Sequence, residues 1–177
     1  MGHAAPGGFL IRTATGGDCP AINAIYNFYV HTSPATFDLV EMTEDWRLDW
    51  FHQRMDRGFP VLVAVDEAGG EVAGWCALAA WSAKAAYDRT AEESIYIADG
   101  YRRHGLGKAL LGAIVEEARD LGKHVVMAGV VNCQAASLAL HESLGFERSA
   151  LNRHMGFKLG EWHDVAYLQR HLWRDER

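Results

Sequence analysis

The sequence contains little of what a secreted or membrane-bound protein needs. Cysteine occurs three times in 177 residues, at Cys19, Cys76 and Cys133, and no two of them have the CxxC spacing of a zinc site. The odd count and wide spacing argue against a disulfide framework, so we expect reduced thiols and a cytoplasmic protein. No apolar run reaches the roughly 18 residues of a membrane span, so we expect no membrane partner. Residues 1–8 lack the segments of a signal peptide and are predicted to be a disordered leader.

Positive charge and linker residues are also scarce. Lys and Arg number 17 against 23 Asp and Glu, which gives a formal net charge of -6 at pH 7. A nucleic-acid-binding protein would present a basic footprint, so we expect no nucleic-acid partner. The four prolines do not gather in a linker, and no segment repeats. We therefore predict one domain over residues 9–177, long enough to bury about 70% of its unfolded surface without a metal or disulfide.

The apolar pattern alternates between strand and helix periodicity along the chain. Strands are predicted at residues 9–15, 60–66, 71–80, 94–98 and 124–131, with two more within 146–172. Helices are predicted after Asp18 and at 44–55, 106–121 and 135–144. Strands and helices alternate in the centre, with hairpins outside it, which indicates a mixed α/β sheet in one layered domain.

Residues 94–108 join a predicted strand to a long helix through a glycine-containing turn. The first amides of a helix lack intrahelical acceptors, and the helix dipole favours an anion there. Gly105 and Gly107 have no side chain to block a close approach. Three basic residues lie beside them, at Arg102, Arg103 and Lys108. The turn therefore predicts a site for a pyrophosphate.

Two common phosphate-binding motifs do not fit this turn. A Walker A loop starting at Gly100 would need Lys after Gly105, where Leu106 stands. A dinucleotide fingerprint starting at Gly105 would need a glycine at Leu110. A nucleotide-binding role is thereby disfavoured, and a helix start whose glycines serve only the turn is the structural alternative.

The pattern Arg-x-x-Gly-x-Gly at residues 102–107 resembles the acyl-CoA-binding signature of the GCN5-related N-acetyltransferase (GNAT) superfamily. Within residues 9–172, further segments resemble the phosphinothricin and methionine sulfoximine acetyltransferase group: Thr36-Phe37, Thr90-x-Glu92, Leu140-His141-Glu142 and Trp162-His163-Asp164-Val165. The resemblance implies a GNAT fold, with a central mixed, twisted sheet of about seven strands and about four helices. It also implies direct transfer of an acetyl group from acetyl-CoA to the primary amine of a small amino acid or analogue, by a homodimer.

The resemblance gives catalytic roles to Glu92 and His141. Glu92 would be the general base that leaves the amine neutral, because only a neutral amine attacks a thioester. It lies just before an apolar strand, where partial desolvation would raise its pKa. Glu93 lies on the opposite side of that strand, so we expect only Glu92 to face the site. His141 would contact the reacting centre or an acidic group of the acceptor; a strand-end carboxylate and a structural histidine are the alternatives.

The resemblance also implies two sets of binding residues. The coenzyme set comprises Ile95, Tyr96, Ile97, Arg102, Arg103, His104, Gly105, Leu106, Gly107, Lys108, Gln134 and Ser137. Residues 95–97 would act through their backbone, bonding the pantetheine arm as an added strand would. The acceptor set comprises Phe37, Ser82, Lys84, Tyr87, Glu92, Glu93, Ser94 and Lys158. Lys84 and Lys158 favour an anionic acceptor, although Lys lacks the planar fork of Arg.

Other functions remain open from the sequence. The acceptor could instead be a polyamine or a protein N-terminus. A non-catalytic acyl-CoA sensor would keep the glycine-containing turn and lose the base. The presence of both Glu92 and His141 favours an enzyme over a sensor.

Overall fold

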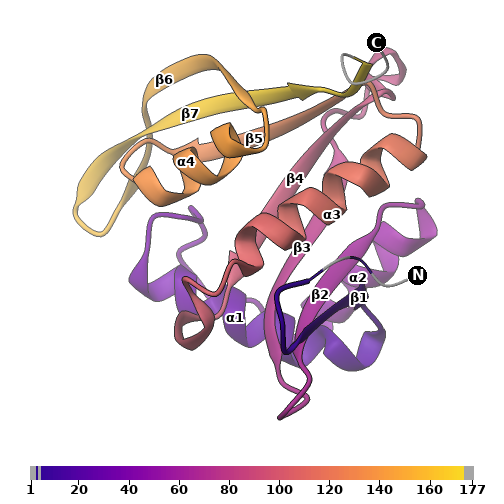
Figure 1. Ribbon diagram of the computed structural model, residues 1–177. Coiled ribbons are helices and arrows are strands. Elements are labelled where there is room, and N and C mark those ends of the chain that lie inside the picture. The colour runs from indigo at the N-terminus through magenta and orange to yellow at the C-terminus, as the bar shows by residue number, and fades with distance from the viewer. Residues whose placement is uncertain (1–2, 4, 174–177) are drawn as a thin grey trace.

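A computed structural model gives the structure of the chain for residues 3 and 5–173; the rest of the predicted leader and residues 174–177 lie outside this description. The described strands are β1 (Phe9–Thr13), β2 (Val61–Asp66), β3 (Val72–Ala80), β4 (Thr90–Ile97), β5 (Val125–Val131), β6 (Glu147–Lys158) and β7 (Glu161–His171). The described α-helices are α1 (Cys19–Thr32), α2 (Glu44–Asp56), α3 (Leu106–Asp120) and α4 (Ala135–Ser143). The strands form one sheet in the order β1-β2-β3-β4-β5-β7-β6, so the predicted fold is confirmed (Figure 1).

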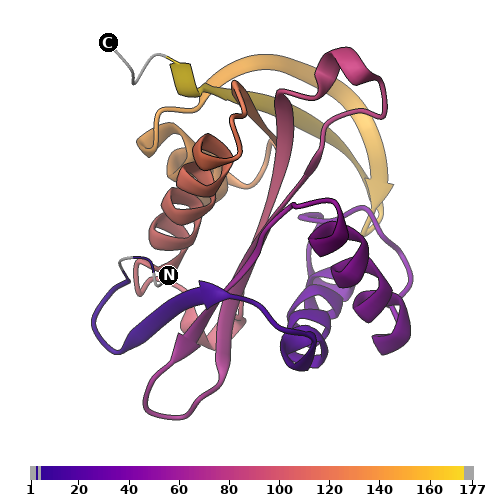
Figure 2. The same cartoon turned by 90° about the vertical axis from the view of Figure 1, so that its right-hand side faces the viewer.

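Helices cover both faces of the sheet. Seen from the side, α3 lies against one face of the central strands, and α1 and α2 lie against the other (Figure 2). Alternation along each strand supplies both cores. Leu62, Cys76 and Leu78 face α3, whereas Val61, Val63 and Trp75 face α1 and α2. No helix of the described residues is long and apolar enough to cross a bilayer.

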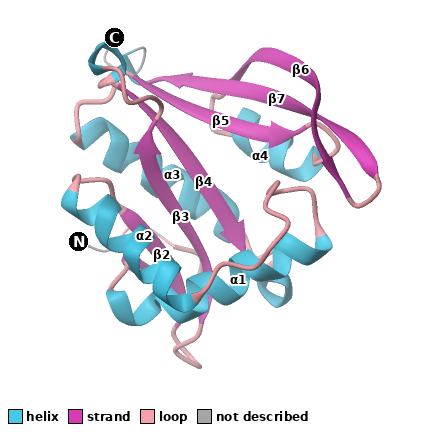
Figure 3. Cartoon of the chain, turned by 180° about the vertical axis from the view of Figure 1, so that it is seen from behind, coloured by secondary structure: helices cyan, strands magenta, loops and turns pink. Residues whose placement is uncertain are grey.

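The sheet opens between β4 and β5. These parallel strands pair only from Thr90 opposite Val125 to Glu92 opposite Met127. β4 stays paired with β3 as far as Ile97, so only its other edge is free (Figure 3). Along residues 93–97 this edge has no strand partner and faces a gap in the sheet. The carbonyl of Ile97 accepts a hydrogen bond from the hydroxyl of Tyr29, 2.6 Å away.

One predicted strand, at residues 94–98, starts more than two residues away from the observed boundary. The strand predicted at 94–98 begins at Thr90, so Glu92 lies inside β4 and not before it. Its pairing with β3, Ala79 opposite Glu92, outweighs the low strand propensity of Ala and Glu. In the C-terminal region, the two strands predicted within 146–172 form a hairpin whose turn is at Leu159 and Gly160.

Candidate active site

A cavity of about 880 Å³ occupies the gap between β4 and β5. Residues 92–97 of β4 form its floor. The last turn of α1 borders it from one face of the sheet, and α3 and α4 border it from the other. The cavity thus passes through the opened sheet and reaches both faces of β4.

The glycine-containing turn forms one end of this cavity. Gly105 precedes α3 with φ +80°, a left-handed conformation that an L side chain would strain. The first intrahelical hydrogen bond runs from the amide of Ala109 to the carbonyl of Gly105, so the amides of residues 106–108 lack a helical acceptor. Arg102 and Lys108 border the cavity beside them. This arrangement fits the diphosphate of a coenzyme A thioester.

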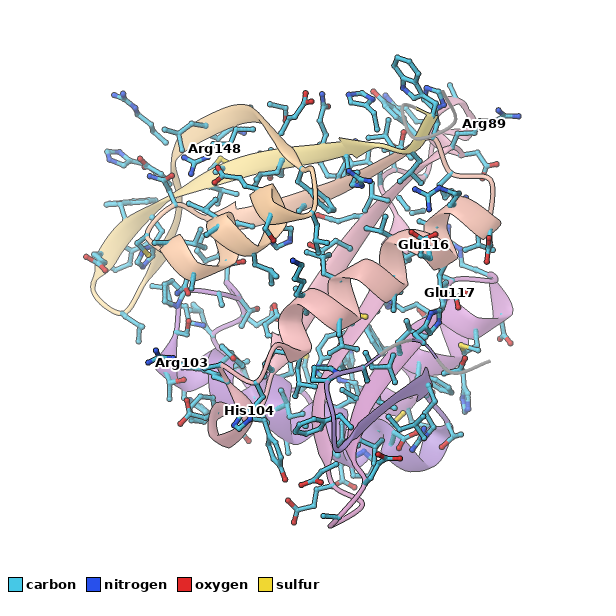
Figure 4. All side chains as sticks on the ribbon, in the orientation of Figure 1. Arg89, Arg103, His104, Glu116, Glu117 and Arg148 are labelled. Carbon is cyan, nitrogen blue, oxygen red and sulfur yellow. The ribbon has the colours of Figure 1, made fainter. Side chains whose placement is uncertain are left out.

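Gly107 has a different structural role from the one we expected. A Cβ atom on Gly107 would lie 3.1 Å from Cδ2 of Leu140 on α4. Its missing side chain therefore allows α3 and α4 to pack closely, besides leaving the turn open. His104 of the expected coenzyme set does not line the cavity; its ring lies 6.1 Å from that of Phe9. Arg103 and His104 lie together at the N-terminal end of α3, far from Arg89 at the start of β4 (Figure 4).

The remaining expected coenzyme residues meet at the middle of the cavity. Ile95, Tyr96 and Ile97 present the free edge of β4, and Gln134 and Ser137 border the cavity at the start of α4. Gln134 donates a hydrogen bond from Nε2 to Oγ of Ser33, 3.2 Å away. Residues from the end of α1 complete the wall, namely Phe28, Tyr29, Thr32, Ser33 and Ala35. No local pattern in the sequence predicts this last group, because only the fold places α1 beside β4.

Glu92 lies half-buried on the face of β4 that α1 and α2 cover. Burial raises the pKa of its carboxyl above the usual value, and the charge of Glu93 raises it further. The charge of Arg54 on α2 lowers the pKa in part. A carboxylate with a raised pKa is suited to take a proton from an ammonium group near neutral pH.

Glu93 and His141 form a buried pair on the opposite face. Oε1 of Glu93 lies 2.9 Å from Nε2 of His141, and Nδ1 of His141 lies 2.7 Å from the carbonyl oxygen of Ser137. A carbonyl only accepts, so Nδ1 carries a hydrogen, and the carboxylate favours a second proton on Nε2. Burial alone would lower the pKa of His141, but Glu93 and the Ser137 carbonyl raise it above the usual value. Glu93 borders the cavity as well as Glu92, whereas we expected only Glu92 to face it.

Comparison with known proteins decides the family. The model of the acetyltransferase (GNAT) family matches residues 22–146. The chain belongs to this family. It is therefore an acetyltransferase, as the glycine-containing turn and the gap beside β4 indicate.

The GNAT enzyme is similar along almost its whole length to proteins with amino-acid acceptors in their names. It is 40% identical to the L-amino acid N-acyltransferase of Escherichia coli (strain K12), over 94% of this chain and 95% of that protein. It is 38% identical to the L-methionine sulfoximine/L-methionine sulfone acetyltransferase of Salmonella typhimurium, over 92% and 94%. A phosphinothricin acetyltransferase of Sinorhizobium meliloti, solved with acetyl-CoA, superposes with a TM-score of 0.90 at 34% identity, covering 93% and 89%.

Most of the expected acceptor residues lie away from the cavity of this acetyltransferase. Glu92, Glu93 and Ser94 border it, but five others do not: Phe37, Ser82, Lys84, Tyr87 and Lys158. Ser82, Lys84 and Tyr87 belong to the loop between β3 and β4, where Lys84 and Tyr87 are exposed.

Lys158 does not present a charge to the cavity. Its side chain is buried, and Nζ donates to the carbonyl oxygens of Thr36 and Tyr29 at 2.7 and 3.3 Å. Phe37 stacks on His163 with ring centroids 6.2 Å apart. These contacts join the loop after α1 to the β6–β7 hairpin. Among the described residues, no three His, Cys, Asp or Glu side chains gather as metal ligands would.

Proposed function

We propose that this acetyltransferase moves an acetyl group from acetyl-CoA to the primary amine of a small amino acid or analogue of the methionine sulfoximine, methionine sulfone or phosphinothricin type. One observation carries the proposal: a single cavity extends from the free amides at the start of α3 to the half-buried carboxylate of Glu92. The names of the similar proteins support the acceptor class.

Glu92 is the general base in this proposal. An amine acceptor enters as an ammonium ion and must lose a proton before its lone pair can attack the thioester carbonyl. The carboxylate of Glu92 takes this proton directly or through water. The amine nitrogen attacks the thioester carbonyl and forms the new C–N bond, and the C–S bond then breaks as the carbonyl reforms. The proton that the nitrogen still has to lose passes to the departing thiolate, which leaves as the thiol of coenzyme A.

His141 is the second catalytic residue in this proposal. It borders the cavity from the face of β4 opposite to Glu92, and Glu93 favours its charged form. A cationic ring there stabilises the negative charge that develops during transfer. The amides of residues 106–108, the edge of residues 95–97, and Gln134 and Ser137 hold the coenzyme.

The environment of Cys76 is unsuited to an acetyl-cysteine intermediate at this residue. Cys76 is buried, and its Sγ donates to the carbonyl of Leu110 at 3.4 Å. Burial, and then the charges of Glu93 and Glu117, raise its pKa well above the usual value. Cys76 therefore stays a neutral thiol, which is a poor nucleophile.

An acceptor screen tests the proposal. Release of coenzyme A from acetyl-CoA is measured with methionine sulfone, methionine sulfoximine and phosphinothricin, and in parallel with spermidine and a peptide N-terminus. Saturable turnover of at least one amino acid analogue, lost in Glu92→Gln, is expected. Turnover of spermidine or peptide alone would overturn the acceptor class. Calorimetric binding of acetyl-CoA without turnover of any acceptor would favour a sensor.

The proposed enzyme is a cytoplasmic homodimer. Large apolar side chains lie exposed on the β6–β7 hairpin, at Leu151, Met155, Phe157, Leu159 and Trp162. Clusters of exposed apolar side chains are typical of protein–protein interfaces. Sedimentation of the purified protein as a monomer at micromolar concentration would contradict the dimer.

A further inference from the structure

Unsatisfied hydrogen-bond donors gather on the face of the sheet that carries Glu92. Within the described residues, four buried side-chain polar atoms lack a hydrogen-bond partner. Three of them are N–H donors on the α1 and α2 side of the sheet: Nη2 of Arg47, Nε of Arg54 and Nε1 of Trp75. Buried donors are usually paired, so an unpaired one needs an explanation, and an acceptor supplied by a ligand is one.

Arg54 is the donor whose charge acts on Glu92, although its side chain is not among those that line the cavity. It belongs to the last turn of α2, and its carbonyl accepts a hydrogen bond from Phe59 just before β2 begins. β2 starts at Val61, opposite Ala77, so the next pair on this face, Ala79 with Glu92, lies beyond the end of β2. On this face the side chains of Ala77 and Ala79 are only methyl groups.

The electrostatics agree with this placement. Burial, and then the charges of Arg47 and Arg57, lower the pKa of Arg54 to about 10. Glu92 is the acidic group whose charge acts in the opposite direction. The positive charge of Arg54 and the carboxylate of Glu92 therefore act on each other across this part of the site.

The guanidinium of Arg54 is fixed but not fully bonded. It lies over the ring of Trp50, with its central carbon 4.0 Å from the ring centroid. Nη1 donates only a long hydrogen bond of 3.5 Å to the Trp50 carbonyl, and Nε has no acceptor. Arg12 makes a contrast, because its two Nη atoms each lie 2.8 Å from an oxygen of Asp18. Within the described residues, Arg54 has no such carboxylate.

We propose that Arg54 binds the α-carboxylate of the acceptor amino acid and so brings the neighbouring amine to Glu92. This assignment rests on the proposed function. The Nε–H of a guanidinium and one Nη–H point in the same direction and match the two oxygens of a carboxylate. In an α-amino acid one carbon separates the amine from the carboxylate, so a base and a cation on the same patch of sheet select this class over simple amines.

The test compares two acceptors that differ only in the carboxylate: methionine sulfone and 3-(methylsulfonyl)propylamine. The values of kcat/KM are measured for the full-length enzyme and for Arg54→Gln, each on the plateau of its own pH profile. We expect the variant to lose about 10- to 100-fold with the amino acid and less than about 3-fold with the amine. Arg54→Lys keeps a charge without the planar fork, and an intermediate loss is expected.

Arg57→Gln is the matched control. Arg57 follows α2, is exposed, and contacts the ring of Phe59 at 5.6 Å, so its removal takes the same charge from the same end of the helix. This variant should change kcat/KM for both acceptors by less than about 2-fold. Melting curves and acetyl-CoA affinity establish that each variant folds and keeps its coenzyme site.

Two outcomes would overturn the assignment while leaving the proposed function intact. An equal loss with both acceptors would mean that Arg54 acts through Glu92 or through the fold. An unchanged preference for the amino acid in Arg54→Gln would place the carboxylate site elsewhere. Failure of the unaltered enzyme to acetylate either acceptor would instead remove the proposed function, and the assignment with it.

Discussion

Glu92 and Glu93 are neighbours on β4, yet the two faces of the sheet give them opposite surroundings. Glu92 is half-buried on the α1 and α2 side of the sheet, and its carboxylate accepts no hydrogen bond within the described part of the chain. Glu93 is 6% exposed, and one of its oxygens is held by His141. Two identical side chains on one strand can thus serve different purposes, one free to exchange a proton and the other committed to a fixed partner.

The largest expected difference between the two residues is in catalysis. Glu92→Gln should lower kcat by about 100-fold or more, because an amide cannot accept the amine proton. The loss of kcat in Glu93→Gln should be at least about 10-fold smaller than the loss in Glu92→Gln, because the base remains. Rates of coenzyme A release with methionine sulfone measure both. An equal or greater loss in Glu93→Gln would assign the base to the other face.

Stability should reverse the order of the two variants. Glu93→Gln replaces a buried carboxylate that bonds His141 and should lower the free energy of unfolding by about 1–3 kcal/mol. Glu92→Gln, which breaks no hydrogen bond, should change it by less than about 0.5 kcal/mol. Urea unfolding at pH 6.5 gives both values. Equal stabilities for the two variants would mean that the Glu93–His141 pair contributes nothing net.

The contribution of His141 to stability should depend on pH with a definite sign. Its folded-state pKa is raised, so the folded state binds the proton more tightly than the unfolded chain. The stabilisation is complete below the unfolded pKa of about 6.5 and is lost as the pH rises through the folded pKa. Glu93→Gln should therefore lower the free energy of unfolding by more at pH 5.5 than at pH 9.5, as paired urea titrations would show. A loss of stability that grows as the pH rises would contradict this assignment.

The smallest expected effect is the influence of Glu93 on the pKa of Glu92, across the two faces of β4. Glu92 must be ionised to accept a proton, so activity should fall as the pH drops through its raised pKa. Glu93→Gln removes a charge that raises this pKa and should move the acid limb of the kcat/KM profile to lower pH by less than about one unit. Glu142→Gln, an exposed change on α4 that breaks only an ion pair with Arg148, is the control. No movement of the limb would show that the two carboxylates are not coupled.

Local patterns were enough to predict much of this site. Period-two alternation predicted that Glu92 and Glu93 lie on opposite faces, and the glycine-containing turn predicted the free amides at the start of α3. Both features depend on residues close together in the sequence. The predicted fold class, a mixed α/β sheet of about seven strands with about four helices, is confirmed.

Contacts between distant residues could not be predicted in this way. Glu93 and His141 are 48 positions apart, and nothing near His141 in the sequence identifies its partner. Lys158 was expected to supply charge to the acceptor, but two carbonyls 122 and 129 positions away hold its ammonium group. The role of Gly107 against Leu140 likewise appears only once α3 and α4 are placed together.

The short pairing of β4 with β5 has a consequence for the whole molecule. Three residue pairs join the half of the sheet formed by β1–β4 to the half formed by β5–β7. An acyl donor lying along the free edge would bridge this seam and stiffen the junction between the halves. Adding coenzyme should therefore raise the free energy of unfolding, by about 2.7 kcal/mol when its concentration is a hundred times the Kd. Amide hydrogens near the seam should then exchange more slowly with solvent deuterium.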